Sequence, residues 1–243
     1  MVTRPTLTLS SAATSLPPFL SKTDKYNISS KCTNSVVSGY FLHPKIYILD
    51  QNFEFGLITR CSSYRTNFSA MTRLDQNRAA AQLALKAGVE VGRVSNVTIW
   101  GNHSSTQFPD AEHATIDGKP VTEVIKDAAW LQTEFVPTVQ KRGAAVIAAR
   151  KLSSAMSAAK AACDHMASWW QGTTQSWVSM AVISDGSYDT PPGVMFSFPV
   201  RVADKEWSIV TGLNMSDFAR AKLAATGAEL CEEREEAMAV CSQ

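Results

Sequence analysis

The sequence predicts a domain of the α+β or α/β class that begins near Asn67. Short runs of β-branched and aromatic residues alternate along the chain with longer segments of helix-forming residues, and turn residues separate the two kinds of segment. Hydrophobic residues make up 45% of the 243 residues. A chain of this length and composition can bury a substantial core, so we expect a folded globular domain.

The first predicted elements are a helix, a strand and a hairpin. The helix covers Thr72 to Gly88, where good helix formers precede Gly88 as the stop. Val94 to Trp100 is rich in β-branched residues and predicts a strand, which leads into a polar loop from Gly101 to Ser105. Asp117-Gly118 predicts the turn of the hairpin.

The middle of the domain is predicted to be helical. Thr122 to Trp170 has room for two or three helices, with irregularities at Pro137 and Gly143. Small residues from Ser153 to Ala162 favour close packing of one of these helices against a neighbour.

Three strands and a final helix complete the domain. The final helix is predicted to begin at an N-cap at Ser216 or nearby and to run towards Val240, with Gly227 as a weak point or kink. Its charged residues, such as Glu229 and Glu232 to Glu236, are expected on the solvent face. The strands and the turns between the first two are predicted at Trp177 to Ile183, Val194 to Val202, Trp207 to Thr211, Asp185-Gly186 and Pro191-Pro192-Gly193.

Residues 1–66 differ in character from residues 67–243, so we divide the chain there. The first part is rich in serine and threonine, has few acidic residues and shows no helical periodicity. Tyr40 to Thr59 has the composition of strands, but Pro44 interrupts it, and we expect poor order. This extension has the composition of an organelle transit peptide, and an irrelevant extension or a misassigned start explains it equally well.

Composition excludes several classes of function. Lysine and arginine number 23 and the acids 22, a balance that predicts no nucleic-acid partner. No apolar run is long enough to cross a membrane, and the N-terminus lacks a secretory signal. Five scattered cysteines without a C-x-x-C pair indicate reduced thiols and no metal site. His43, His113 and His165 lack metal-ligand spacing and are expected to be solvated or capping residues.

Three residues form a candidate site by their chemistry. Asp75 and Arg78 stand three apart on the first predicted helix and therefore project from the same face. His103 lies in the polar loop after a predicted strand. A guanidinium can bind a carboxylate through two hydrogen bonds, and an imidazole can move a proton at a neighbouring oxygen. The spacing alone is also consistent with a surface ion pair between Asp75 and Arg78 and a loop histidine without a function.

Longer motifs give the chain a resemblance to a known family. Asn67 to Arg78 (NFSAMTRLDQNR) and Val97 to Gln107 (VTIWGNHSSTQ) closely resemble two signature stretches of cytosolic-type malate dehydrogenases. The resemblance reaches the C-terminus and implies an α+β catalytic domain with long helices packed on an antiparallel sheet. Later segments of the family appear in order at Gln140 to Ile147, Lys151 to Ala159, Ile183 to Tyr188 and Phe196 to Pro199.

The resemblance implies reversible hydride transfer between NAD and the C2 carbon of malate or oxaloacetate, a reaction of the tricarboxylic acid cycle. His103 matches the residue that accepts and returns the C2 hydroxyl proton. Asp75 matches its partner, which fixes the tautomer and favours the protonated ring. Arg78 matches the arginine that binds the C1 carboxylate. Ser157 matches a pocket hydroxyl, although Ser153 and Ser154 are not separable from it by sequence.

One departure from the family limits the implied activity. No G-x-G-x-x-G follows a predicted strand, so the cofactor-binding residues are unknown, and we expect weak or no activity from this chain alone. Cys231 and Cys241 resemble the C-terminal pair of plastid NADP-dependent relatives, but only two residues follow Cys241, which favours NAD. The expected partner is a second copy or a full-length subunit. Alternatives are a catalytically silent partner of such a subunit and a dehydrogenase of lactate or another 2-hydroxy acid.

The family also implies a location. The cytosolic-type motifs favour the cytoplasm, with a plastid or mitochondrion as the alternative if residues 1–66 act as a transit peptide.

Overall fold

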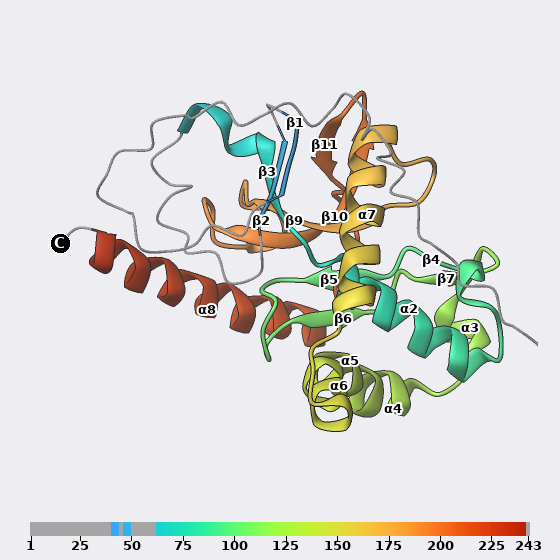
Figure 1. Cartoon of the computed structure of the whole chain (residues 1–243). Coiled ribbons are helices and arrows are strands. Elements are labelled where there is room, and N and C mark those ends of the chain that lie inside the picture. The colour runs from blue at the N-terminus through green and yellow to red at the C-terminus, as the bar shows by residue number, and fades with distance from the viewer. Residues whose placement is uncertain (1–39, 44–45, 50–61, 242–243) are drawn as a thin grey trace, which may run out of the picture. The chain divides into compact units, whose positions relative to one another are not determined.

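The computed structural model describes residues 40–43, 46–49 and 62–241 (Figure 1). Most of residues 1–66 lies outside these ranges, so the predicted poor order and transit function of this segment are not addressed. The domain boundary at residue 67 stays a prediction. The helices are α2 (Arg73–Ala87), α3 (Val121–Val124), α4 (Ala128–Trp130), α5 (Val136–Gln140), α6 (Arg142–Arg150), α7 (Ala155–Gln171) and α8 (Asp217–Cys241), with 3-10 turns η1 (Ser62–Asn67), η2 (Val91–Arg93) and η4 (Ser187–Asp189) and one π-helical turn, η3 (Leu131–Phe135).

The strands form one larger sheet and two small ones. The larger sheet has the order β1-β2-β3-β9-β10-β11, in which β2 and β3 are parallel and the other pairs antiparallel. The small sheets are β4-β7-β8 and β5-β6. The strands are β1 (Tyr40–His43), β2 (Ile46–Leu49), β3 (Phe68–Ala70), β4 (Val94–Ser95), β5 (Thr98–Trp100), β6 (Phe108–Asp110), β7 (Thr115–Ile116), β8 (Lys119–Pro120), β9 (Val178–Ile183), β10 (Met195–Ala203) and β11 (Glu206–Ile209).

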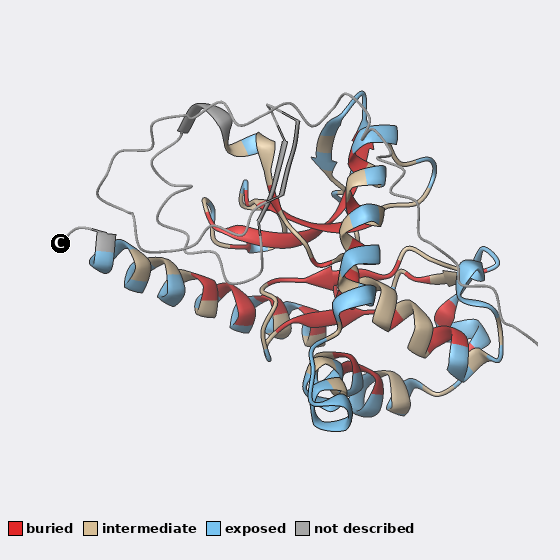
Figure 2. Ribbon diagram, viewed as in Figure 1, coloured by how far each residue is buried: buried red, intermediate tan, exposed pale blue. Residues whose placement is uncertain are grey.

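Long helices packed on a mainly antiparallel sheet confirm the predicted α+β class. Helix α2 packs against α7 and β9, α7 also contacts β10, and α8 contacts β6 and β10 (Figure 1). Strand β9 is buried along nearly its whole length, because helices and the β5-β6 pair cover the sheet (Figure 2). Apolar side chains such as Trp100, Phe196 and Phe198 are fully buried there and supply most of the favourable free energy of folding.

The first predicted helix is confirmed and the strand after it is divided. Gly88 ends α2 in the left-handed conformation at φ 67°, and its backbone N–H bonds the carbonyl oxygens of the last turn. Val94 to Trp100 is not one strand, because Asn96 has a φ of 60° and turns the chain. As a result, β4 and β5 join different sheets. The predicted hairpin turn at Asp117-Gly118 joins β7 and β8.

The helical middle region is more broken than predicted. A π-helical turn lies between α4 and α5, and Lys151, at φ 60°, separates α6 from α7. The small residues from Ser153 to Ala162 are mainly exposed, and Ala161 alone among them is fully buried. The packing of α7 instead uses Ala161 together with His165 and Trp169. His165 is therefore a buried residue, and its prediction as a solvated or capping residue was wrong.

The C-terminal helix begins as predicted. Ser216 Oγ accepts the backbone N–H of Ala219 at 3.2 Å, so Ser216 is the N-cap. Gly227 does not interrupt α8; it is buried, and a Cβ built there would lie 2.9 Å from Pro191 Cδ. Glu229 is half-buried and bonded to a loop, so its prediction as a solvent-face residue was wrong. None of the helices that the structure describes has the length and apolar character of a membrane span.

Candidate functional site

The N-terminal half of α2 supplies two charged side chains of the site. Asp75 and Arg78 stand one turn apart, so they share a face of the helix. The Asp75 side chain is fully buried, whereas the Arg78 side chain keeps 16% of its surface exposed. Arg78 Nη1 donates a hydrogen bond to Asp75 Oδ1 over 3.1 Å. The buried carboxylate is thus paired with a guanidinium that remains reachable from solvent.

His103 reaches the same carboxylate from another part of the fold. It lies in the loop of residues 101–107 between β5 and β6, and its Nδ1 is hydrogen-bonded to Asp75 Oδ2. With Nδ1–H given to an ionised carboxylate, the lone pair of the neutral ring is at Nε2. The His103 side chain is 26% exposed, which leaves a ligand room to approach the ring. The structure therefore brings His103, Asp75 and Arg78 together, with Asp75 between the other two.

The loop that carries His103 is fixed at both ends. At its start, Gly101 exchanges backbone hydrogen bonds of 3.2 and 3.0 Å with Ser197 of β10. At its end, Gln140 of α5 donates to the carbonyl oxygen of Gln107 at 2.6 Å. A histidine presented by a loop with two fixed ends keeps a defined direction, which proton transfer requires.

A cavity of about 480 Å³ lies beside Arg78. It is lined by residues of α2, α5, α6 and α7 and includes Ser154 and Ser157, whereas Ser153 is not part of its lining. The sequence did not decide which of these three serines lines the pocket, and the structure places Ser154 and Ser157 in the cavity beside Arg78. Neither His103 nor Asp75 is among the residues that line this cavity.

The charged neighbours of this cavity are partly paired. Lys160 Nζ lies 2.7 and 2.9 Å from the two carboxylate oxygens of Asp164. Arg73, whose Nη1 bonds Ser168 Oγ at 3.1 Å, has a pKa lowered by burial and raised in part by Asp164. Among the described residues, no group of three or more histidine, cysteine, aspartate and glutamate side chains is arranged to hold a metal ion.

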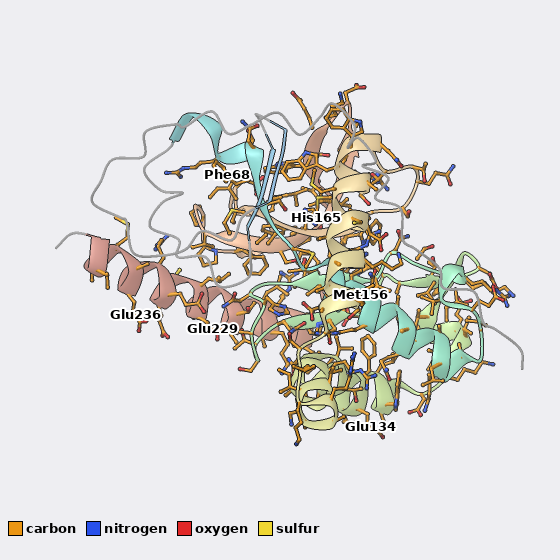
Figure 3. The ribbon with its side chains drawn as sticks, viewed as in Figure 1. Phe68, Glu134, Met156, His165, Glu229 and Glu236 are labelled. Carbon is orange, nitrogen blue, oxygen red and sulfur yellow. The ribbon has the colours of Figure 1, made fainter. Side chains whose placement is uncertain are left out.

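Sequence reasoning missed two residues that contact the His103 loop. Thr226 and Glu229, both on α8, bond the backbone and side chains of residues 102–106. Figure 3 labels Glu229 on this helix. Their sequence context, a helix rich in glutamate, gives no indication of this contact. Only the packing of α8 against the β5-β6 pair and β10 brings them to the loop.

Comparison with known proteins assigns the chain to a family. Residues 72–241 match the family model for the lactate/malate dehydrogenase alpha/beta C-terminal domain. The chain is 60% identical over 181 residues to cytoplasmic malate dehydrogenase of Caenorhabditis elegans, an alignment that covers 72% of this chain and 54% of that protein. With the human cytoplasmic enzyme it shares 58% identity over 179 residues, covering 71% and 54%. The chain thus spans about half the length of the curated relatives it matches.

Solved structures agree with this assignment. A malate dehydrogenase from Naegleria fowleri superposes with a TM-score of 0.71 at 40% identity, covering 77% of this chain and 59% of that one. A Trichomonas vaginalis lactate dehydrogenase in complex with NADH and oxamate gives a TM-score of 0.75 at 31% identity, covering 81% and 63%.

Proposed function

Because this chain belongs to the lactate/malate dehydrogenase family, we propose that it carries the proton-transfer and carboxylate-binding residues of a malate dehydrogenase. The proposed reaction is the reversible NAD-dependent oxidation of (S)-malate to oxaloacetate. One observation carries the proposal: a single buried carboxylate, Asp75, bonds both His103 and Arg78. Neither a surface ion pair nor an ordinary loop histidine accounts for that convergence.

The proposed role of His103 is to exchange a proton at the C2 oxygen. In malate oxidation Nε2 accepts the hydroxyl proton, and in oxaloacetate reduction it returns one to the carbonyl oxygen. Asp75 holds Nδ1–H, so it orients the ring and stabilises the positive charge that the ring gains. A fully buried carboxylate does this more strongly than an exposed one, because water screens it less.

Arg78 is proposed to bind the C1 carboxylate of the substrate. Its Nη1 contacts Asp75, and the guanidinium has further N–H groups with which to form a bidentate pair. Gly143 of α6 lies beside this guanidinium, because a Cβ built there would be 3.8 Å from Arg78 Nη1, an ordinary contact distance. Ser157, from the same cavity, is proposed as a further hydroxyl that contacts the substrate.

The described residues do not fit a dinucleotide site. Helix α2 follows β3 directly through Met71 and Thr72, and Thr72 Oγ1 bonds Ser197 Oγ at 2.7 Å. This turn has no glycine to let a pyrophosphate approach the backbone, and the sequence contains no G-x-G-x-x-G. NAD remains the proposed cofactor of the reaction, supported by the family and by the NADH-bound relative. The steps derived from this chain are proton exchange and carboxylate binding only.

The proposed partner is a second subunit of the same kind, as a homodimer or a complex with a full-length subunit. Helix α6 has no buried residue, and Ile147, Leu152 and Met156 around it are 51%, 68% and 84% exposed. Exposed apolar side chains this close together favour an interface. The cytoplasm is the proposed location, because the Caenorhabditis elegans and human relatives carry that location in their names.

The proposal is tested by titrating the isotope-labelled chain with malate and recording the His103 imidazole and arginine side-chain NMR signals. We expect both to shift saturably and Arg78→Lys to weaken binding by about 10-fold or more, since lysine cannot form a bidentate pair. Arg220→Lys is the matched control on α8, where the arginine is exposed and 3.8 Å from Asp189. Absence of any malate-induced shift would refute the proposal, and equal shifts with lactate would favour another 2-hydroxy acid.

A further inference from the structure

We infer that Thr226 and Glu229 of α8 are positioning residues that hold His103 against Asp75. Neither residue is hydrogen-bonded to His103 itself; both are hydrogen-bonded to loop residues beside it. The role in catalysis rests on the proposed function, whereas the geometric claim about the loop does not.

Thr226 fixes the start of the loop through a close approach. The side chain of Thr226 is fully buried and occupies the space that a Cβ at residue 101 would take, and Gly101 has a φ of 85°. Glycine is therefore required at position 101 for two reasons: it adopts the positive φ without strain, and it has no Cβ to clash with Thr226. The backbone N–H of Asn102 then donates to Thr226 Oγ1 over 2.8 Å. The residue before His103 is in this way tied to α8 by its main chain.

Glu229 fixes the loop on both sides of the histidine. Its Oε2 accepts hydrogen bonds from Asn102 Nδ2 at 3.2 Å, from Ser104 Oγ at 2.6 Å and from the hydroxyl of Thr106. Hydrogen bonds to an ionised acceptor are about twice as strong as neutral ones. Three of them from alternate residues leave the loop little freedom around position 103.

The outer parts of the loop are held by other elements. Gly101 bonds Ser197 of β10, and Gln107 bonds Gln140 of α5. Residues 102–106, the part that includes His103, are tied to α8. Burial also raises the pKa of Glu233, which accepts the second hydrogen of Asn102 Nδ2 at 2.7 Å. The contact with α8 therefore continues one turn beyond Glu229.

The test uses two NMR observations that need no substrate. One is hydrogen exchange of the Asn102 amide, and the other is the Nδ1 proton of His103, which is shared with Asp75. We expect Thr226→Val to speed exchange of the Asn102 amide by about 10-fold or more, because valine keeps the shape but removes the acceptor. We expect Glu229→Ala to broaden or shift the His103 proton. Thr226→Ser restores the hydroxyl and is expected to restore the wild-type behaviour.

Controls separate positioning from general stabilisation. Glu232→Ala removes an exposed glutamate from the same helix and is expected to change neither signal. The Gly101 amide, bonded to β10, and the ring signals of His113, beside Asp110, are expected to stay unchanged in every variant. Unchanged Asn102 and His103 signals in Thr226→Val and Glu229→Ala would overturn the inference. The inference would also be overturned if the Gly101 and His113 signals changed along with those of Asn102 and His103. In that case the substitutions in α8 would destabilise the whole domain and not the loop alone.

These NMR measurements use no malate, so their outcome does not depend on the malate titration that tests the proposed function. If the titration fails, the positioning of His103 by α8 can still be confirmed, and if the positioning fails, malate binding can still be confirmed.

Discussion

Asp75 and His165 show two outcomes of burying an ionisable side chain. Asp75 is fully buried, but a guanidinium and an imidazole donate to it, so its charge is compensated. His165 is fully buried as well, and neither of its ring nitrogens has a hydrogen-bond partner among the described residues. Burial and the nearby charge of Arg73 lower its pKa from 6.5 to about 3. Such a histidine is neutral in the folded protein at physiological pH.

We predict that His165 makes the protein acid-sensitive. Unfolding returns the ring to its ordinary pKa, so between pH 6.5 and about 3 the unfolded chain binds a proton that the folded chain does not. Stability therefore falls as pH falls, by roughly 1.4 kcal/mol per pH unit below 6.5. Replacing His165 by leucine, which is similar in volume and uncharged, is expected to flatten this dependence. Urea unfolding at pH 7.5, 6.5 and 5.5 measures it.

The comparison for His165→Leu is His113→Leu. The Asp110 carboxylate, whose Oδ2 lies 3.6 Å from Nδ1 of His113, raises the pKa of His113, so its proton stabilises the folded state at low pH. Its removal is expected to steepen the loss of stability towards low pH. An equal pH dependence of wild type and His165→Leu would show that the buried ring does not control acid sensitivity.

At the level of elements, close packing decides features that local propensity leaves open. Gly227 lies within α8, where glycine costs about 1 kcal/mol relative to alanine. A larger residue does not fit at this position, because Pro191, in the segment between β9 and β10, lies against the helix there. Glycine is thus a contact residue between α8 and the sheet, and the same helix holds the His103 loop.

Gly227→Ala is therefore expected to destabilise the protein although it improves helix propensity. A Cβ 2.9 Å from Pro191 Cδ forces the segment or the helix to shift, and overpacking of this kind costs about 1–3 kcal/mol. After the gain in propensity, we expect a loss of about 1 kcal/mol in the free energy of unfolding. Chemical denaturation measures it. Ala225→Gly at an exposed position of α8 gives the propensity effect alone, and a stabilised Gly227→Ala variant would contradict the packing argument.

At the level of the whole molecule, the candidate site holds the groups proposed for proton exchange and carboxylate binding, and the described residues do not fit a dinucleotide. The relatives that it matches are about twice as long as the aligned region, and the described residues offer no glycine-rich turn between strand and helix. Hydride transfer requires the nicotinamide to be held against C2. We therefore expect that substrate binding and turnover can be separated by experiment in this chain.

We predict slow turnover by the chain alone. With oxaloacetate and NADH, the rate of NADH oxidation is expected to lie about 100-fold or more below that of a full-length relative, because the described residues include no glycine-rich turn to hold the cofactor against C2. His103→Gln controls for catalysis by contaminating enzyme. A rate close to that of the full-length relative would contradict this prediction. No binding of NAD, together with co-purification of a full-length subunit, would favour the silent-partner function.

The sequence by itself determined most helices and strands and, through the family resemblance, the α+β class and the three residues of the candidate site. It could do so because helices and strands follow local periodicity, and because the motifs around Asp75, Arg78 and His103 are long enough to resemble one family closely. The sequence could only predict that these side chains lie together, since 28 residues of chain separate Asp75 from His103. The proposed chemical roles of these residues remain predictions.

Only the tertiary structure decided what lies around that site. The break at Asn96, the burial of His165 and the contact of Glu229 with the loop depend on elements distant in sequence, and helix periodicity placed Glu229 on the wrong face. Thr226 and Asn102 are 124 residues apart. A hydrogen bond over such a separation exists because α8 packs on β6 and β10, and no local pattern of residues contains that information.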